Sequence, residues 1–300
     1  MKSSSQKQDA NFHIDFMKFH KLFLCLSGLM MITAIVLLFT KGLNMGIDFT
    51  GGMLLEIKMT AQQESTSLAD TRIKLDTLSA GKPTIQEFGD GSIMIKIPGK
   101  EMNQAQQKSL SDEVKKLLGE GVEFRRVEYV GPQVGKELVI VGIKAFVYSL
   151  IGIMAYIWFR FEWQFGFTSV FSLAHDVCAT ILFMILTGFE FDLTSIAAVL
   201  LVAGYSINDT VVVFDRVREL LRKYRKMDLA ELLNLSVNQT LSRTIKTSLT
   251  TVMALIALLI FGAEVIKSFT YIMLIGIFIG TYSSIFIAAP MLIYMNIKRE

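Results

Sequence analysis

The chain has few of the residues on which disulfide-rich domains and metal centres depend. Its 300 residues include only two cysteines, three histidines and four prolines. Both cysteines, Cys25 and Cys178, stand inside apolar blocks, so neither a disulfide framework nor a CxxC metal site is predicted. The formal net charge is only +3, and no arginine-rich patch with interleaved aromatics occurs. These absences argue against a metal, any other cofactor, and nucleic acid as a partner.

Sequence patterns of common enzymes are also missing. Ser206 in GYSIN does not stand in a GxSxG elbow, and the chain has neither HExxH nor a GxxxxGK[ST] loop. Intramembrane proteolysis and ATP hydrolysis therefore have little support. We expect no enzymatic activity and no catalytic residue.

Apolar residues are abundant and stand in long blocks. They make up 52% of the sequence, and the mean hydropathy is +0.48, more than in an average soluble domain. A helix needs about 20 apolar residues to cross a bilayer. Six such stretches predict an α-helical polytopic membrane protein, and the first lacks a cleavage pattern, so we expect it to remain as an anchor. The predicted transmembrane helices span residues 19–40, 138–159, 165–187, 193–214, 244–262 and 269–295.

Basic residues in the short loops predict the orientation. The TGFEFDL loop after the third span has no Lys or Arg, whereas the loop predicted at 215–243 begins with a dense basic run. Both tails, residues 1–18 and 297–300, are therefore expected in the cytoplasm. Residues 41–137 are then expected outside, because long segments translocate largely regardless of charge.

The exterior segment predicts a small α+β domain. Strand patterns occur in GGMLLEIKM, TIQEF, SIMIKIP and VEFRRVEYV, helix patterns at 64–79 and 102–118, and a hairpin at Gly-Asp-Gly. The order βαββαβ is that of ferredoxin-like domains. Since the segment contains no Cys or His, a binding or docking domain is favoured over a catalytic one.

The third predicted span carries a polar stripe, with Asp176 about midway along it and His175 beside this carboxylate. A carboxylate in hydrocarbon costs about 3 kcal/mol on insertion scales, so it usually persists with a partner or in a wet cavity. Two interpretations of His175 and Asp176 remain: a structural hydrogen bond, and a place in a proton relay. At helical spacing, the stripe comprises Ser169, Ser172, Asp176, Thr180 and Thr187.

The fourth span carries a second carboxylate, Asp209, preceded by Asn208 and, one turn earlier, Ser206. Asp215 stands six residues further on, so Asp209 should lie roughly 9 Å above the cytoplasmic end.

The opening TLSRTIKT of the fifth span puts Arg243 and Thr247 on one stripe at a depth comparable to that of Asp209. An Asp facing an Arg across a hydroxyl-lined crevice predicts a proton pathway. A fixed ion pair that holds the two helices in register is the alternative.

Small residues cluster at three places. The motifs GIDFTGG and VGPQVG flank the exterior domain and suit paired hinges, with tight turns as the alternative. Small residues at every fourth position of the sixth span predict a packing seam. The hinge residues are Gly46, Asp48, Gly51, Gly52, Gly131, Pro132 and Gly135, and the seam residues are Gly276, Gly280, Ser284 and Ala288.

Five motifs, in this order, resemble the SecF branch of the SecD/SecF family of the bacterial Sec export machinery. They are GIDFTGG, VGPQVGKEL, AHD, GYSINDTVVVFDRVRE and TLSRT, and the resemblance covers nearly the whole chain. It implies the resistance-nodulation-division membrane fold and use of the proton-motive force to promote late steps of preprotein export. In that family the carboxylate of IND and the arginine of SRT are associated with proton transport, and they fall on Asp209 and Arg243.

The resemblance also implies a location and partners. The location is the bacterial inner membrane. Related transporters have twelve spans in two similar halves, so this chain resembles one half, and SecD would supply the other as an obligate partner. The SecYEG channel, YidC and YajC, translocating preproteins and the lipid bilayer complete the expected surroundings. Half of a proton-coupled small-molecule or lipid exporter, and a passive scaffold, remain alternatives.

Overall fold

Six long apolar helices dominate the structure, a computed structural model of the chain. It describes residues 14–59, 68–78, 83–87, 92–99, 102–119, 121–263, 266–295 and 297. The Gly-Asp-Gly turn expected at 89–91 and the ends of both tails lie outside these residues. The helices long and apolar enough to cross a membrane span Met17–Thr40, Gln133–Arg160, Trp163–Thr187, Leu193–Lys223, Leu229–Phe261 and Lys267–Tyr294, which confirms the predicted polytopic fold.

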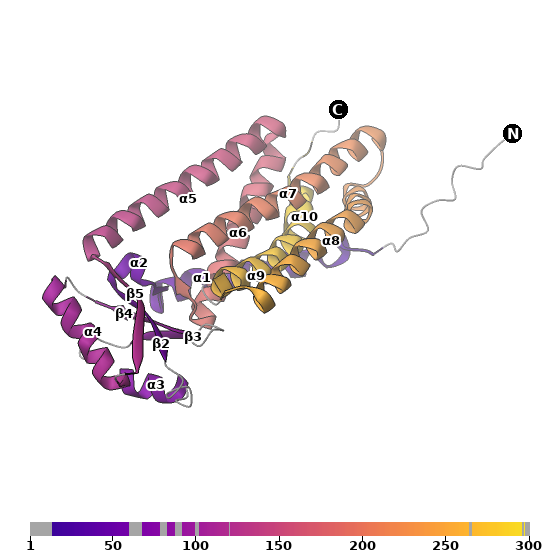
Figure 1. The fold of residues 1–300 in the computed structure, drawn as a ribbon. Coiled ribbons are helices and arrows are strands. Elements are labelled where there is room, and N and C mark those ends of the chain that lie inside the picture. The colour runs from indigo at the N-terminus through magenta and orange to yellow at the C-terminus, as the bar shows by residue number, and fades with distance from the viewer. Residues whose placement is uncertain are drawn as a thin grey trace.

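A small α/β domain stands between the first two of these helices, at one end of the bundle (Figure 1). The membrane part is built from α1 (His20–Thr40), α5 (Pro132–Arg160), α6 (Trp163–Thr187), α7 (Leu193–Lys223), α8 (Leu229–Phe261) and α9 (Lys267–Ser283). The small α/β domain, called the exterior domain after its expected location, is built from β2 (Gly52–Met59), α3 (Leu68–Leu75), β3 (Thr84–Glu87), β4 (Ser92–Pro98), α4 (Gln104–Leu118) and β5 (Val122–Val130).

The exterior sheet is antiparallel with the strand order β3-β4-β2-β5. Together with the element order βαββαβ, this is the ferredoxin-like arrangement. Alternate residues of β2 point to one face, where Met53, Leu55 and Ile57 are fully buried against α4 residues such as Val114. Helices α3 and α4 thus cover one face of the sheet.

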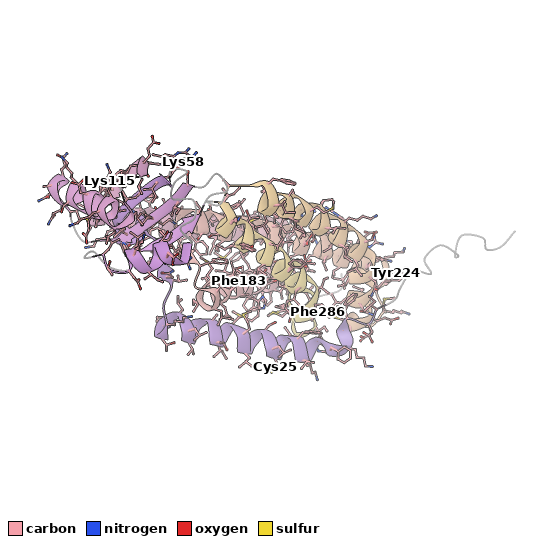
Figure 2. The ribbon with its side chains drawn as sticks, turned by 60° about the horizontal axis from the view of Figure 1, so that its bottom comes forward. Cys25, Lys58, Lys115, Phe183, Tyr224 and Phe286 are labelled. Atoms are coloured by element: carbon pink, nitrogen blue, oxygen red, sulfur yellow. The ribbon has the colours of Figure 1, made fainter. Side chains whose placement is uncertain are left out.

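The membrane helices differ in how deeply they are buried. Helices α7 and α9 pack closely together, with α6 and α8 beside them. Helix α1, which carries Cys25, runs along the outside of the bundle (Figure 2). Helix α5 is the least buried of the six spans. The inner helices α6, α7 and α9 therefore form the part of the bundle in which buried polar groups can meet.

Helices α7 and α8 continue beyond the predicted spans, which corrects the loop expected at 215–243. Helix α7 ends at Lys223 and α8 begins at Leu229, so only a short connection separates them. Leu220 of α7 packs with Leu232 and Leu233 of α8 in a buried cluster. Helical periodicity persists where hydropathy falls, and hydropathy marks the edge of the bilayer rather than the end of a helix.

The last span is irregular near its C-terminal end. Helix α9 passes into a π-helical turn at Ser284–Ala288, followed by α10 (Ala289–Met291) and a 3-10 turn at Leu292–Tyr294. Pro290 lies in α10 and lacks a backbone donor, which disfavours a regular continuation. Single π turns inside helices occur frequently at functional sites.

Two short elements connect the exterior domain to the bundle. The strand β1 (Asn44–Met45) follows α1 and pairs in parallel with β6 (Glu190–Phe191), which directly precedes α7. The helical turn α2 (Ile47–Thr50) then leads into β2. The junction therefore joins the start of the exterior domain to the start of α7.

Candidate functional site

Asp176 is fully buried where α6, α7 and α9 meet. Its Oδ2 accepts a hydrogen bond from the hydroxyl of Ser206 on α7. The same oxygen accepts one from Oγ of Ser283 on α9 at 2.7 Å, and Oδ1 lies 2.9 Å from Nδ1 of His175. Three helices are thus joined through one carboxylate.

Glycines of α9 permit this close approach. A Cβ at Gly280 would lie 2.8 Å from Cβ of Ser206, and Gly276 lies directly against Val202. Both glycines therefore face α7, and Ser283, three residues after Gly280, reaches Asp176. Ser284 is also buried, but it donates to the carbonyl of Thr281 at 3.0 Å.

Aromatic and hydroxyl contacts extend this cluster toward α1. The His175 ring lies 5.9 Å from the Tyr282 ring, centroid to centroid. The Tyr282 hydroxyl lies 3.0 Å from Oγ of Ser27 on α1. An open cavity of about 520 Å³ is lined by Ser27, His175 and Tyr282 together with apolar side chains. The cluster thus connects the buried Asp176 with the outer helix α1.

Asp209 lies on α7 one turn after Ser206 and is only 2% exposed. Its Oδ2 is buried and has no hydrogen-bond partner in the described part of the chain. The Arg243 charge acts on Asp209 electrostatically. However, these two described side chains form no ion pair, and Arg243 is exposed on α8. In this structure the Asp209 carboxylate therefore interacts with the Arg243 charge without forming an ion pair with it.

Several other buried hydroxyls have no partner among the described residues. Buried polar atoms are nearly always hydrogen-bonded to protein or water, so these hydroxyls are suited to binding water. By contrast, the Thr247 hydroxyl donates to the carbonyls of Arg243 and Thr244 in its own helix. The unpartnered hydroxyls belong to Ser169 and Ser172 on α6, Tyr205 and Thr210 on α7, and Thr244 on α8.

Two polar residues at this depth face outward. Asp209 lies 14 residues before the end of α7 at Lys223, and Arg243 lies 14 residues after the start of α8 at Leu229. Each is therefore roughly 21 Å from the end of its helix, and both helices extend beyond the predicted spans. Asn208 is exposed on α7, as Arg243 is on α8.

The polar stripe predicted for α6 lies largely in the interior. Ser169, Ser172, Asp176 and Thr180 are buried, whereas Thr187 is exposed at the end of the helix. Sequence reasoning did not identify Ser283 as a partner of Asp176. Ser283 follows Gly280 by three residues and Gly276 by seven, so it lies on the same helix face as the packing seam. This spacing could have identified Ser283 as a partner.

The residues predicted as hinges lie in a packed junction. The Gly46 N–H donates to the Phe191 carbonyl at 2.9 Å. Gly51 and Gly52 have positive φ angles of 76° and 151°. A Cβ at Gly135 would lie 2.7 Å from the carbonyl oxygen of Phe49, so this glycine allows α5 to approach α2.

Two other predicted junction residues begin α5: Gly131 precedes the helix with a φ of −68°, and Pro132 is its first residue. Asp48 binds α7 instead: its Oδ2 accepts from the Leu193 N–H at 3.1 Å. The GIDFTGG motif thus contacts the first turns of both α5 and α7.

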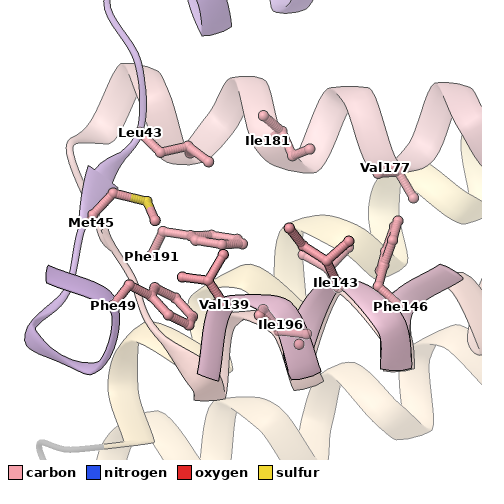
Figure 3. A pocket seen from close by; sticks show the side chains of 12 residues that line it. Leu43, Met45, Phe49, Val139, Ile143, Phe146, Val177, Ile181, Phe191 and Ile196 are labelled. Atoms are coloured by element: carbon pink, nitrogen blue, oxygen red, sulfur yellow. The ribbon is translucent and has the colours of Figure 1, made fainter. Parts of the chain in front are cut away.

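An apolar cavity of about 210 Å³ lies beside this junction. Met45, Phe49 and Phe191 line the end at the exterior domain, and Phe146 and Val177 line the other end (Figure 3). Val139 and Ile143 of α5 form one wall. Space therefore remains between α5 and the start of α7.

Known families and proteins share both the membrane helices and the junction. The family described as "Protein export membrane protein SecD/SecF, C-terminal" matches residues 110–298. The family "SecD/SecF GG Motif" matches residues 36–63. The protein translocase subunit SecF of Rickettsia rickettsii (strain Sheila Smith) is 41% identical over 95% of this chain and 92% of its own length. That of Rickettsia bellii (strain OSU 85-389) is 41% identical over 95% of both chains.

Solved structures agree with this assignment. The crystal structure of SecDF, a translocon-associated membrane protein from Thermus thermophilus, is 34% identical and superposes with a TM-score of 0.81 over 95% of this chain. SecDF in its super-membrane-facing form is 33% identical, with a TM-score of 0.72. The chain spans 39% of the length of each of these SecDF chains. The chain therefore belongs to the SecD/SecF family of protein export membrane proteins.

Proposed function

We propose that this protein is the SecF-type half of a proton-driven export motor in the bacterial inner membrane. It acts without enzymatic chemistry of its own, promotes late steps of preprotein translocation, and has both termini in the cytoplasm. The observation that carries the proposal is the buried Asp209, whose Oδ2 has no partner among the described residues.

Asp209 suits proton exchange because its carboxylate is buried, has an unpartnered Oδ2 among the described residues, and interacts with the Arg243 charge without forming an ion pair. Proton binding would neutralise Asp209 and remove its attraction to Arg243, which lies on another helix. A charge that crosses 100 mV releases about 2.3 kcal/mol. That is enough to shift a two-state equilibrium by roughly fiftyfold, since 1.4 kcal/mol corresponds to a factor of ten. Protonation of Asp209 would therefore bias the positions of α7 and α8.

Asp176 has a different role in this proposal. Its carboxylate is engaged by Ser206, Ser283 and His175, and these contacts favour a structural role. Ser206 stands one turn from Asp209 on the same helix, so movement of α7 at Asp209 would strain the contact with Asp176. We propose that Asp176 fixes the resting arrangement of α6, α7 and α9.

The exposed polar groups support a partner half. Asn208 and Arg243 lie at the depth of Asp209 and are exposed in this chain alone. Polar and charged groups facing lipid are costly, so a second protein is expected to cover them. We propose a SecD-type half as that partner. The SecYEG channel, YidC, YajC and the translocating preprotein remain further proposed neighbours.

The test is proton-dependent export into inverted membrane vesicles that carry the complete Sec machinery. Asp209→Asn keeps the size of the side chain and its hydrogen-bonding capacity but removes titration, so we expect loss of the stimulation by a proton gradient. Asp215→Asn is the matched control, because Asp215 lies on the same helix but is exposed and pairs with Arg160 at 3.0 Å. Stimulation that survives in Asp209→Asn would overturn the proposal.

A further inference from the structure

We infer that Asp48 and the Lys96–Glu190 ion pair are positioning residues through which movement of α7 reaches the exterior domain. The inference rests on the proposed function, in which α7 moves when Asp209 gains or loses a proton. It assigns the mechanical connection to three side chains at the junction rather than to the glycines of the flanking motifs.

The first contact is at the N-terminus of α7. The initial N–H groups of a helix have no partner within the helix, and the positive end of the helix dipole attracts carboxylates. Asp192 accepts from the Ser195 N–H at 2.8 Å, and Asp48 accepts from the Leu193 N–H at 3.1 Å. Asp48 belongs to α2, which leads directly into the exterior sheet. One N–H of the α7 terminus is therefore bound by the exterior side of the junction.

The second contact is made by the segment just before α7, which contains β6. β6 pairs with β1, and the Asn44 side chain donates to the carbonyl of Gly188 at 3.0 Å. Ser195 in the first turn of α7 donates to the Glu190 carbonyl at 3.0 Å. The backbone around Glu190 is thus attached both to α7 and to the strand that begins the junction.

The third contact joins this segment to the exterior sheet itself. Nζ of Lys96, on β4, lies 2.7 Å from Oε2 of Glu190, and the two side chains are only 14% and 11% exposed. Removing one partner from a shielded ion pair leaves an uncompensated charge. Lys96 pairs in register with Leu54 of the central strand β2. Since β4 lies between β3 and β2, the ion pair holds an inner strand of the sheet and not an edge strand.

Helix α7 connects these contacts to the proton site. Leu193 and Asp209 are 16 residues apart on one helix, which corresponds to roughly 24 Å. A shift or rotation of α7 at Asp209 is therefore carried to Leu193 and Glu190. The apolar cavity beside Phe49 and Phe191 leaves room for the junction to move against α5 (Figure 3).

The experiment uses the reconstituted complex with its SecD-type partner and measures distances by double electron–electron resonance. One spin label is placed at Ile73 of α3 and the other at Phe39 of α1, which are 69% and 83% exposed. Cys25 and Cys178 are replaced beforehand. We expect the distance to change when a proton gradient is imposed, and this change to be absent in Asp209→Asn.

The variants then separate the connection from the proton site. Glu190→Gln and Asp48→Ala should lose the gradient-dependent distance change while proton movement through the complex persists. Lys96→Glu combined with Glu190→Lys should restore the gradient-dependent distance change. Such a recovery would exclude misfolding as the cause of the loss in Glu190→Gln. Glu128→Gln is the matched control, because Glu128 pairs with Arg126 at an exposed site of the same domain.

Two results would contradict the inference in different ways. If Glu190→Gln and Asp48→Ala keep the full distance change, the exterior domain is moved by other contacts, and the proposed function stands. If the unmodified complex shows no change with a gradient and Asp209→Asn behaves identically, both the proposed function and this inference are wrong.

Discussion

The close approach of α9 to α7 at Gly280 predicts a measurable effect of one methyl group. A Cβ at Gly280 would lie 2.8 Å from Cβ of Ser206, whereas ordinary contacts of this kind are at least 3.4 Å. Gly280→Ala must therefore push α9 and α7 apart by about 0.6 Å, the difference between these distances. Overpacking of this kind costs about 1–3 kcal/mol.

The same separation weakens the site around Asp176. The carboxylate is held by Ser206 from α7 and by Ser283 from α9, so it cannot keep both contacts unchanged when these helices move apart. A hydrogen bond to a charged group contributes about 1.5–3 kcal/mol. We therefore expect Gly280→Ala to lower both the stability of the bundle and its proton-dependent stimulation of export.

Gly152→Ala is the matched control. Gly152 lies on the outer helix α5, and a Cβ there would meet nothing within 4 Å. Both substitutions bring the same gain in helix propensity, which then cancels in the comparison. In reversible unfolding by denaturing detergent, Gly280→Ala should be less stable than Gly152→Ala by about 1–3 kcal/mol. Equal stability of the two variants would refute the packing argument.

Two further predictions concern orientation and the role of Asp176. A cysteine at Ile73, which is 69% exposed on the exterior domain, should react with a membrane-impermeant thiol reagent in cells whose outer membrane is permeabilised and whose inner membrane is intact. A cysteine at Lys226 should react only after the inner membrane is opened, and the reverse pattern would invert the topology. Asp176→Asn retains an acceptor for Ser206 and Ser283, so it should reduce proton-dependent export much less than Asp209→Asn does. An equally complete loss in export assays would instead make Asp176 part of the proton relay.

Hydropathy and spacing were sufficient to predict the six spans and the order of the exterior elements, because both depend on local patterns. The extension of α7 and α8 was not predicted, since residues such as Leu220 and Leu232 pack against each other beyond the bilayer rather than within a hydrophobic block. Helical periodicity indicates which residues share a face, but it does not identify the facing helix. For that reason Asp176 could be singled out, while its partner Ser283, 107 residues away, could not.

The junction shows the same limit more clearly. The glycines of GIDFTGG suggested hinges. Asp48 in that motif was named among the hinge residues, but no contact partner was predicted for it. Its contact with Leu193 is 145 residues away in sequence, and Lys96 and Glu190 are 94 residues apart. Nothing in the local pattern around Lys96, an ordinary polar residue of a strand, distinguishes it from the other lysines of the exterior domain.

The central claim is that Asp209 carries protons, and proton movement through the reconstituted complex tests it most directly. Proteoliposomes with a pH-sensitive dye inside would be given a membrane potential, and acidification would be compared between the unmodified protein, Asp209→Glu and Asp209→Asn. Asp209→Glu retains a titratable carboxylate and should retain part of the proton flux, whereas Asp209→Asn should reduce the flux to that of protein-free vesicles. Undiminished flux through Asp209→Asn would contradict the account.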